Sequence, residues 1–229
     1  MTTSPFSKGQ LARMIIARFT GAILVLGAVF FLPAGTFDYW EAWVYIAVIL
    51  VPAVFVVRYL IRHDPALLER RTRMKERQVR QGFIVKLSGV FFLALILLPG
   101  FDRRFEWSSV PAAVVIAAEA LVLLGYQLVF AVFRENTYTS RLVEVERGQQ
   151  VISSGPYAVV RHPMYAGALA MFLFTPLALG SYWATIPALA FIPIVVARLL
   201  DEEQLLWRDL PGYPEYMQKV KYRLIPGVW

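Results

Sequence analysis

The chain has 229 residues, of which 58% are hydrophobic and only 17% are charged, and its formal net charge is +7 at pH 7. This composition excludes an ordinary soluble globular protein and is typical of one small integral membrane domain. The chain contains no cysteine, which excludes disulfides, thiolate nucleophiles and cysteine-ligated metal sites. Its two histidines, His63 and His162, lie far apart in sequence, so we expect no metal.

Six apolar stretches follow one another and predict an all-α, polytopic membrane fold with about six transmembrane helices. They lie at 14–32, 41–59, 83–100, 109–132, 165–180 and 182–199. Most approach the roughly 20 residues that cross about 30 Å of hydrocarbon. The last two are short, which predicts a tight hairpin that either spans the membrane or enters and returns. The first stretch is too long for a cleavable signal peptide, and no cleavage site follows it.

Basic residues concentrate in alternate connections. They crowd residues 58–86, 134–164 and the tail after residue 200, whereas the other connections carry few charges. By the positive-inside rule, this distribution predicts that both termini are cytoplasmic. We expect an integral protein of a bacterial inner (cytoplasmic) membrane. Its basic surface should meet anionic lipid headgroups and not nucleic acid.

Polar segments divide the chain into two parts. Residues 1–133 should hold four transmembrane helices and the basic connector 58–86, in which Asp64-Pro65 predicts the start of a short amphipathic helix. Residues 134–229 should hold a cytoplasmic segment with short extended stretches, the hairpin and the tail. In the tail, Pro211-Gly212 should end the sixth helix.

Polar side chains gather at both ends of the expected hairpin. The sequence before it is Gly155-Pro156-Tyr157-Ala158-Val159-Val160-Arg161-His162-Pro163-Met164-Tyr165-Ala166-Gly167, and the sequence after it is Arg198-Leu199-Leu200-Asp201-Glu202-Glu203. Because a hairpin brings its ends together, these groups should meet at one membrane face. Two carboxylates beside anionic headgroups are unfavourable unless a cationic group neutralises them. The arrangement therefore indicates a binding site.

Simpler interpretations of the same residues stay open. Arg198 and Glu202 are four residues apart and could form a surface ion pair on one helix face. His162 could cap a helix that has Pro163 in its first turn. Tyr157 and Tyr165 could be ordinary interfacial aromatic residues.

Together, these motifs resemble the isoprenylcysteine carboxyl methyltransferase family, with its relatives the phospholipid N-methyltransferases. The resemblance covers roughly residues 136–226. Its motifs are Gln149-Gln150-Val151-Ile152, Gly155-x-Tyr157, Arg161-His162-Pro163-Met164-Tyr165-x-Gly167, Arg198-x-x-x-Glu202-Glu203 and Gly212-x-x-x-Tyr216. The resemblance implies methyl transfer from S-adenosylmethionine to a lipophilic small-molecule or lipidated acceptor at the cytoplasmic membrane face. It also implies a cofactor pocket built from the 134–164 segment and the tail.

The resemblance also implies roles for individual residues. Those expected to contact the cofactor are Gln149, Gln150, Val151, Ile152, Tyr157, His162, Pro163, Met164, Tyr165 and Glu202. Catalytic roles fall to Arg198, which would face the acceptor, and to Glu203. An acceptor carboxylate is already ionised at pH 7 and needs only an orienting cation, for which the arginine fork is suited. An amine or thiol acceptor would need deprotonating, with Glu203 or Tyr165 as candidates.

Two other functional classes compete with a methyltransferase. One is an NADPH-dependent membrane reductase of the sterol-reductase type, and the other is a non-catalytic scaffold or small transporter. A transporter should place polar groups near the bilayer midplane, where this chain has only Glu119, in the fourth stretch. Glu119 could line a polar cavity or could be a packing residue in an alanine-rich helix contact.

Overall fold

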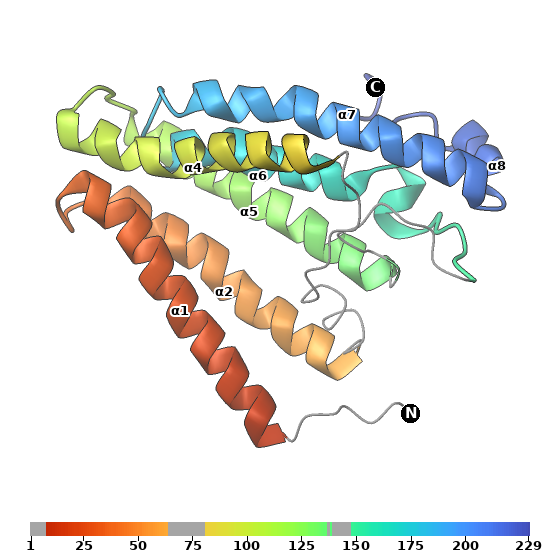
Figure 1. Ribbon diagram of the computed structural model, residues 1–229, viewed down its shortest axis with the longest axis horizontal. Coiled ribbons are helices and arrows are strands. Elements are labelled where there is room, and N and C mark those ends of the chain that lie inside the picture. Colours follow the sequence, from red (N-terminus) through yellow and green to blue (C-terminus); the bar gives the residue numbers. More distant parts are fainter. Residues whose placement is uncertain (1–7, 64–80, 137, 139–147) are drawn as a thin grey trace.

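The structure is a computed structural model that describes residues 8–63, 81–136, 138 and 148–229 (Figure 1). All regular structure in these ranges is helical. The helices are α1 (Lys8–Ala34), α2 (Trp40–His63), α4 (Gln81–Phe105), α5 (Ala112–Glu135), the 3-10 turn η1 (Gly155–Ala158), α6 (Pro163–Ala178), α7 (Thr185–Asp209) and α8 (Tyr213–Lys219). The prediction of an all-α fold is confirmed. The predicted amphipathic helix after Asp64 and most of the predicted extended stretches lie outside the described residues.

The long helices run back and forth, so that connections alternate between two ends of the molecule. The α1–α2, α4–α5 and α6–α7 connections lie at one end, on the left in Figure 1. The end of α7, α8 and the last residues of the chain lie at the other end. Helices α6 and α7 form the expected hairpin, and α7 continues past the predicted span to Asp209.

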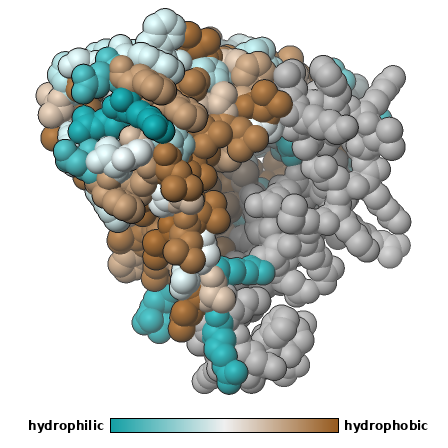
Figure 2. Space-filling model, turned by 60° about the vertical axis from the view of Figure 1, so that its left-hand side comes forward, coloured by the Kyte–Doolittle hydropathy of each residue, from teal (hydrophilic) through white to brown (hydrophobic). Residues whose placement is uncertain are grey.

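Within the part of the chain that the structure describes, three helices are long and apolar enough to cross a membrane: Ile16–Ala34 within α1, α2 and α5. Helix α6 is apolar, but its 16 residues rise about 24 Å, less than a typical hydrocarbon core of about 30 Å. Helix α7 carries no charged residue up to Ala197 and then carries Arg198 and the consecutive acidic residues Asp201, Glu202 and Glu203. Apolar side chains cover much of the described surface in Figure 2. An integral membrane protein is supported, whereas six crossings and the cytoplasmic location of the termini stay predictions.

Helices α5 and α6 approach each other through two glycines. A Cβ built on Gly125 would lie 2.7 Å from the carbonyl oxygen of Gly167, and a Cβ on Gly167 would lie 2.7 Å from that of Gly125. Small residues allow such close backbone contact between membrane helices. This contact holds the first turn of α6, where the polar motifs begin, against α5.

Replacing Gly167 by alanine should therefore destabilise the protein. The added methyl group has no room between the two backbones, and overpacking of this kind costs about 1–3 kcal/mol. Thermal unfolding in detergent would measure the effect. Gly27→Ala is the matched control, because a Cβ there meets nothing within 4 Å; equal behaviour of the two variants would contradict the close contact.

A buried polar cluster joins the three connections at the left-hand end. The Tyr39 hydroxyl donates to the carbonyl oxygen of Leu179 at 2.6 Å. The hydroxyls of Ser108 and Ser181 both donate to Oδ2 of Asp102, whose side chain is buried. Leu179 and Ser181 of the α6–α7 connection are thus hydrogen-bonded to the α1–α2 connection and, through Asp102, to the α4–α5 connection, which fixes this end of the hairpin.

Candidate functional site

The segment before α6 is shaped by a short turn and a proline. Gly155 has φ of +54°, a left-handed conformation that favours glycine, and it opens the turn η1. Pro163 then occupies the first turn of α6, as expected, and His162 is the N-cap residue. The His162 side chain makes no capping hydrogen bond, so capping does not account for this histidine.

The tail returns to this segment after a sharp turn. Gly212, with φ of +85°, is the N-cap residue immediately before α8. The chain beyond α8 then lies beside residues 161 and 162: the Arg161 N–H donates to the carbonyl oxygen of Tyr222, and the His162 N–H donates to that of Arg223, each at 2.9 Å. Two consecutive backbone hydrogen bonds therefore join the start of α6 to residues near the end of the chain.

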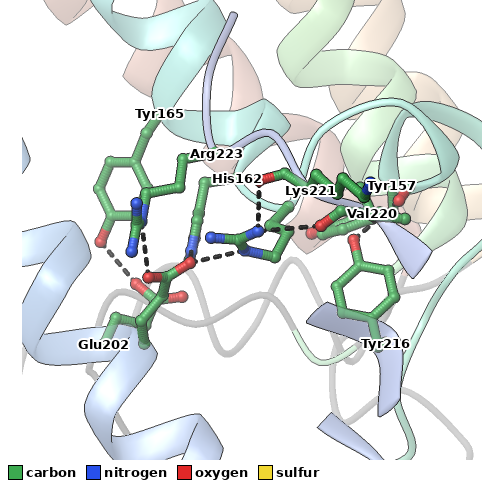
Figure 3. A network of polar contacts seen from close by, with 10 residues as sticks. Tyr157, His162, Tyr165, Glu202, Tyr216, Val220, Lys221 and Arg223 are labelled. Carbon is green, nitrogen blue, oxygen red and sulfur yellow. Dashed lines mark hydrogen bonds and ion pairs between the residues drawn. The ribbon is translucent and has the colours of Figure 1, made fainter. Parts of the chain in front are cut away.

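A buried ion network surrounds Glu203 (Figure 3). Arg161 Nε donates to its Oε1 and Arg223 Nε to its Oε2, each at 2.7 Å. Nη1 of Arg161 also donates to the carbonyl oxygens of Val220 and Lys221, at 2.9 and 2.7 Å. His162 Nε2 lies 3.3 Å from Oε1 of Glu203. Arg161, His162 and Glu203 are all at most 6% exposed, so charged groups from three segments neutralise one another away from solvent.

The network determines the ionisation of Glu203. Burial alone would raise the pKa of Glu203, but the donors of His162, Arg161 and Arg223 outweigh it and lower the pKa to about 2. A carboxylate with such a pKa is a poor proton acceptor at neutral pH. This environment therefore disfavours the expected role of Glu203 in deprotonating an acceptor.

Glu202 has a different environment from its neighbour. Its Oε2 accepts a hydrogen bond of 2.6 Å from the Tyr165 hydroxyl, and Arg198 also interacts with the Tyr165 oxygen. Glu202, Tyr165 and Arg198 are all half-buried. The structure thus groups an acid, a phenol and a guanidinium that are less enclosed than the network of Glu203.

The other expected cofactor residues differ in burial, and two of them, Val151 and Tyr157, contact the tail. Val151 packs against a buried cluster of tail side chains that consists of Leu210, Tyr213, Tyr216 and Val220. Tyr157 is held twice: its hydroxyl accepts from Asn136 Nδ2 at 2.9 Å, and its carbonyl oxygen accepts from the Tyr216 hydroxyl at 2.7 Å. Of the rest, Pro163 is buried, Gln149, Ile152 and Met164 are half-buried, and Gln150 is exposed.

Sequence reasoning did not assign functional roles to Arg161, Arg223 or Tyr213. The two adjacent carboxylates, Glu202 and Glu203, indicated that a cationic group must lie near them. In the structure, Arg161 and Arg223 are the cationic groups that neutralise Glu203. Tyr213 has a buried hydroxyl, and its pKa is raised by burial and by the charge of Glu203. Its position could not be read from spacing, because it depends on how the tail folds back.

One buried polar atom at the site, the hydroxyl oxygen of Tyr213, has no hydrogen-bond partner among the described residues. Nε2 of His162 faces Oε1 of Glu203 at 3.3 Å, so its interaction is with that carboxylate. Unsatisfied buried polar atoms are rare in folded proteins and call for an explanation. The Tyr213 hydroxyl, which is close enough to Glu202 and Glu203 to feel their charges, provides hydrogen-bonding capacity that a polar ligand could use.

Comparisons with known proteins match a part of the chain that overlaps the expected resemblance over residues 136–209. Residues 113–209 match the family model described as phospholipid methyltransferase. The chain is also 36% identical over 85 residues to a Delta(14)-sterol reductase of Mus musculus, a match that covers 36% of this chain and 20% of that relative. The chain thus spans about a fifth of the length of this relative. Helices α5 to α7 therefore carry a phospholipid methyltransferase domain match.

Proposed function

We propose that this protein transfers a methyl group from S-adenosylmethionine to a lipophilic acceptor at the cytoplasmic face of a membrane. The observation that carries the proposal is the meeting of His162, Tyr165, Glu202 and the tail at one end of the α6–α7 hairpin. The phospholipid methyltransferase match over residues 113–209 supports it.

The residues at the site suit the cofactor chemically. S-adenosylmethionine carries a sulfonium and an ammonium, and it supplies an electrophilic methyl group when bound. Glu202 would balance this positive charge, and the aromatic faces of Tyr165 and Tyr213 would attract it. The unsatisfied hydroxyl of Tyr213 would hydrogen-bond one of its polar groups. In this proposal, the remaining cofactor contacts come from residues 149–152, Tyr157, Pro163 and Met164.

Glu203 has a positioning role in the proposal. It joins Arg161 of the segment before α6 to Arg223 of the tail and so holds the two walls of the site together. Arg198 orients the acceptor through its cationic fork. Because the buried ion network disfavours Glu203 as a base, a carboxylate acceptor, which needs no deprotonation, fits the site more simply than an amine or a thiol.

Calorimetry on the full chain in detergent tests the proposal. The wild-type protein should bind S-adenosylmethionine and its demethylated product. Glu202→Gln should weaken binding of S-adenosylmethionine about tenfold or more, because it removes a charged hydrogen-bonding partner. Asp201→Asn is the matched control, since Asp201 is the exposed neighbour. Absence of binding to the wild type, or an equal loss in the control, would contradict the proposal.

Arg198→Lys separates acceptor orientation from cofactor binding. Lysine keeps the charge but not the bidentate geometry. We expect kcat to fall at least tenfold while the affinity for S-adenosylmethionine changes less than about twofold. Methylation kinetics beside calorimetry would measure both, and an equal loss of both would place Arg198 on the cofactor.

A second candidate function is an NADPH-dependent membrane reductase, which the partial identity to a Delta(14)-sterol reductase favours. The same calorimetry discriminates between the two. Binding of NADPH with no response to S-adenosylmethionine would favour the reductase. Binding of neither would favour a scaffold or small transporter.

A further inference from the structure

A groove of about 440 Å³ lies between α1 and α4, and its lining is almost entirely apolar. The lining residues are Ala28, Val29, Leu32, Pro33, Leu97, Phe101 and Arg104. The groove is located towards the end of the molecule that holds the α1–α2 and α4–α5 connections, away from Glu202 and Glu203. Leu32 is 73% exposed, so the groove opens outward, on a surface that would face lipid.

A close helix contact fixes α1 and α4 beside the groove. A Cβ built on Gly100 of α4 would lie 2.8 Å from the Cβ of Pro33 and 2.9 Å from the carbonyl oxygen of Phe30, both in α1. The two backbones therefore touch there. This contact fixes the spacing of the α1 and α4 backbones, so the groove beside it depends on that spacing as well as on side-chain rotamers.

Exposed aromatic side chains lie in or next to the three connections at this end of the molecule. They are Phe37, Trp43, Phe105, Trp107 and Trp183, each at least half exposed. Aromatic belts of this kind mark the boundary between hydrocarbon and headgroups. Arg104, in the last turn of α4, therefore lies at headgroup level while the apolar lining extends towards the hydrocarbon.

The two adjacent arginines at this end differ in their partners. Arg103 Nη2 donates to the carbonyl oxygen of Asp38 at 2.9 Å and lies 3.9 Å from its carboxylate. The guanidinium carbon of Arg104 lies 3.7 Å from the position of a Cβ on Gly35 and 5.8 Å from the Phe105 ring centre. No carboxylate pairs with Arg104 within the described ranges. A positive charge thus remains at the mouth of an apolar groove.

We propose that this groove binds a phospholipid of the surrounding membrane, with one acyl chain along the apolar lining and the phosphate on Arg104. Arginine binds phosphate oxygens through paired N–H groups. Only a ligand that combines a long apolar chain with an anion at headgroup depth matches both parts of the site. The proposal does not depend on the proposed methyltransferase function.

Native mass spectrometry of the full chain in mild detergent tests this site, with dioleoyl phosphatidylglycerol as the added lipid. The wild type should retain one tightly bound phospholipid. Arg104→Ala should weaken this binding about tenfold, as expected for loss of a charged hydrogen-bonding partner. Leu97→Trp, which fills the groove, should weaken it comparably. Arg103→Ala is the matched control and should change it less than about twofold.

Dioleoylglycerol, which has the same acyl chains but no phosphate, serves as the second probe. It should bind the wild type about as weakly as the phospholipid binds Arg104→Ala. Equal binding of the two lipids to the wild type would overturn the role of Arg104. An equal loss of phospholipid binding in Arg104→Ala and Arg103→Ala would indicate non-specific charge attraction. Unchanged binding in Leu97→Trp would mean that the lipid does not occupy the groove. Either result would also overturn the proposal.

Discussion

Glu203→Gln should release the tail from the start of α6, at a cost of about 3–5 kcal/mol. Removing the charge leaves Arg161 buried without its counter-ion, and truncating one partner of a buried pair is far more damaging than losing a surface pair. Arg161 and Glu203 are 6% and 5% exposed, so water cannot replace the lost partner.

Hydrogen exchange in detergent would measure this release. The amides of Arg161 and His162, which donate to the tail, should exchange about a hundredfold faster or more in Glu203→Gln. Asp201→Asn should leave them unchanged. If both variants exchanged alike, the buried network would not hold the tail.

A double variant sharpens the test. Arg161→Met combined with Glu203→Met replaces the ion pair by apolar side chains, which buried sites often tolerate. Arg223, whose side chain is 29% exposed, could then turn to water. The double variant should therefore be less destabilised than the sum of its single variants, as a coupling energy requires.

Acidification should release the tail in the same way. The pKa of Glu203 is lowered from 4.5 to about 2, so ionised Glu203 stabilises the folded state above pH 4.5, and this contribution is lost as pH falls from 4.5 to 2. A shift of this size corresponds to about 3 kcal/mol. On acidification the wild type should therefore lose stability through this carboxylate, whereas Glu203→Gln has no carboxylate at this position to protonate.

The comparison of the two proteins isolates Glu203 from other titrating groups. The exchange rates of the Arg161 and His162 amides would be followed from pH 6 to pH 2.5 and corrected for intrinsic exchange. The rates in the wild type and in Glu203→Gln should differ most near pH 6. The difference between the wild type and Glu203→Gln should narrow through the interval below pH 4.5. A constant difference over the whole range would mean that the carboxylate of Glu203 is not the source of the stabilisation.

Some of the site could be predicted from sequence because it depends on local patterns. The apolar stretches at 165–180 and 182–199 predicted a hairpin, and α6 and α7 form one. A hairpin must bring His162 close to Glu202 and Glu203, and His162 lies 3.3 Å from Glu203. Pro163 and Gly212 likewise predicted a helix start and a chain turn.

The different environments of Glu202 and Glu203 were decided by tertiary structure. Adjacent residues on a helix point in directions about 100° apart, so one carboxylate faces Arg161 and Arg223 while the other faces Tyr165. The sequence offered no reason to assign the buried network to Glu203. That assignment requires the path of the tail, which brings Arg223 back to residue 162.

The sequence by itself determined the helical membrane character and the end of the hairpin where polar groups gather, since both follow from hydropathy and from chain connectivity. Only the tertiary structure decided which cation neutralises which acid, where the α1–α4 groove opens and that Gly125 and Gly167 touch. These features depend on contacts between residues distant along the chain, and local sequence patterns do not encode the distances between such residues.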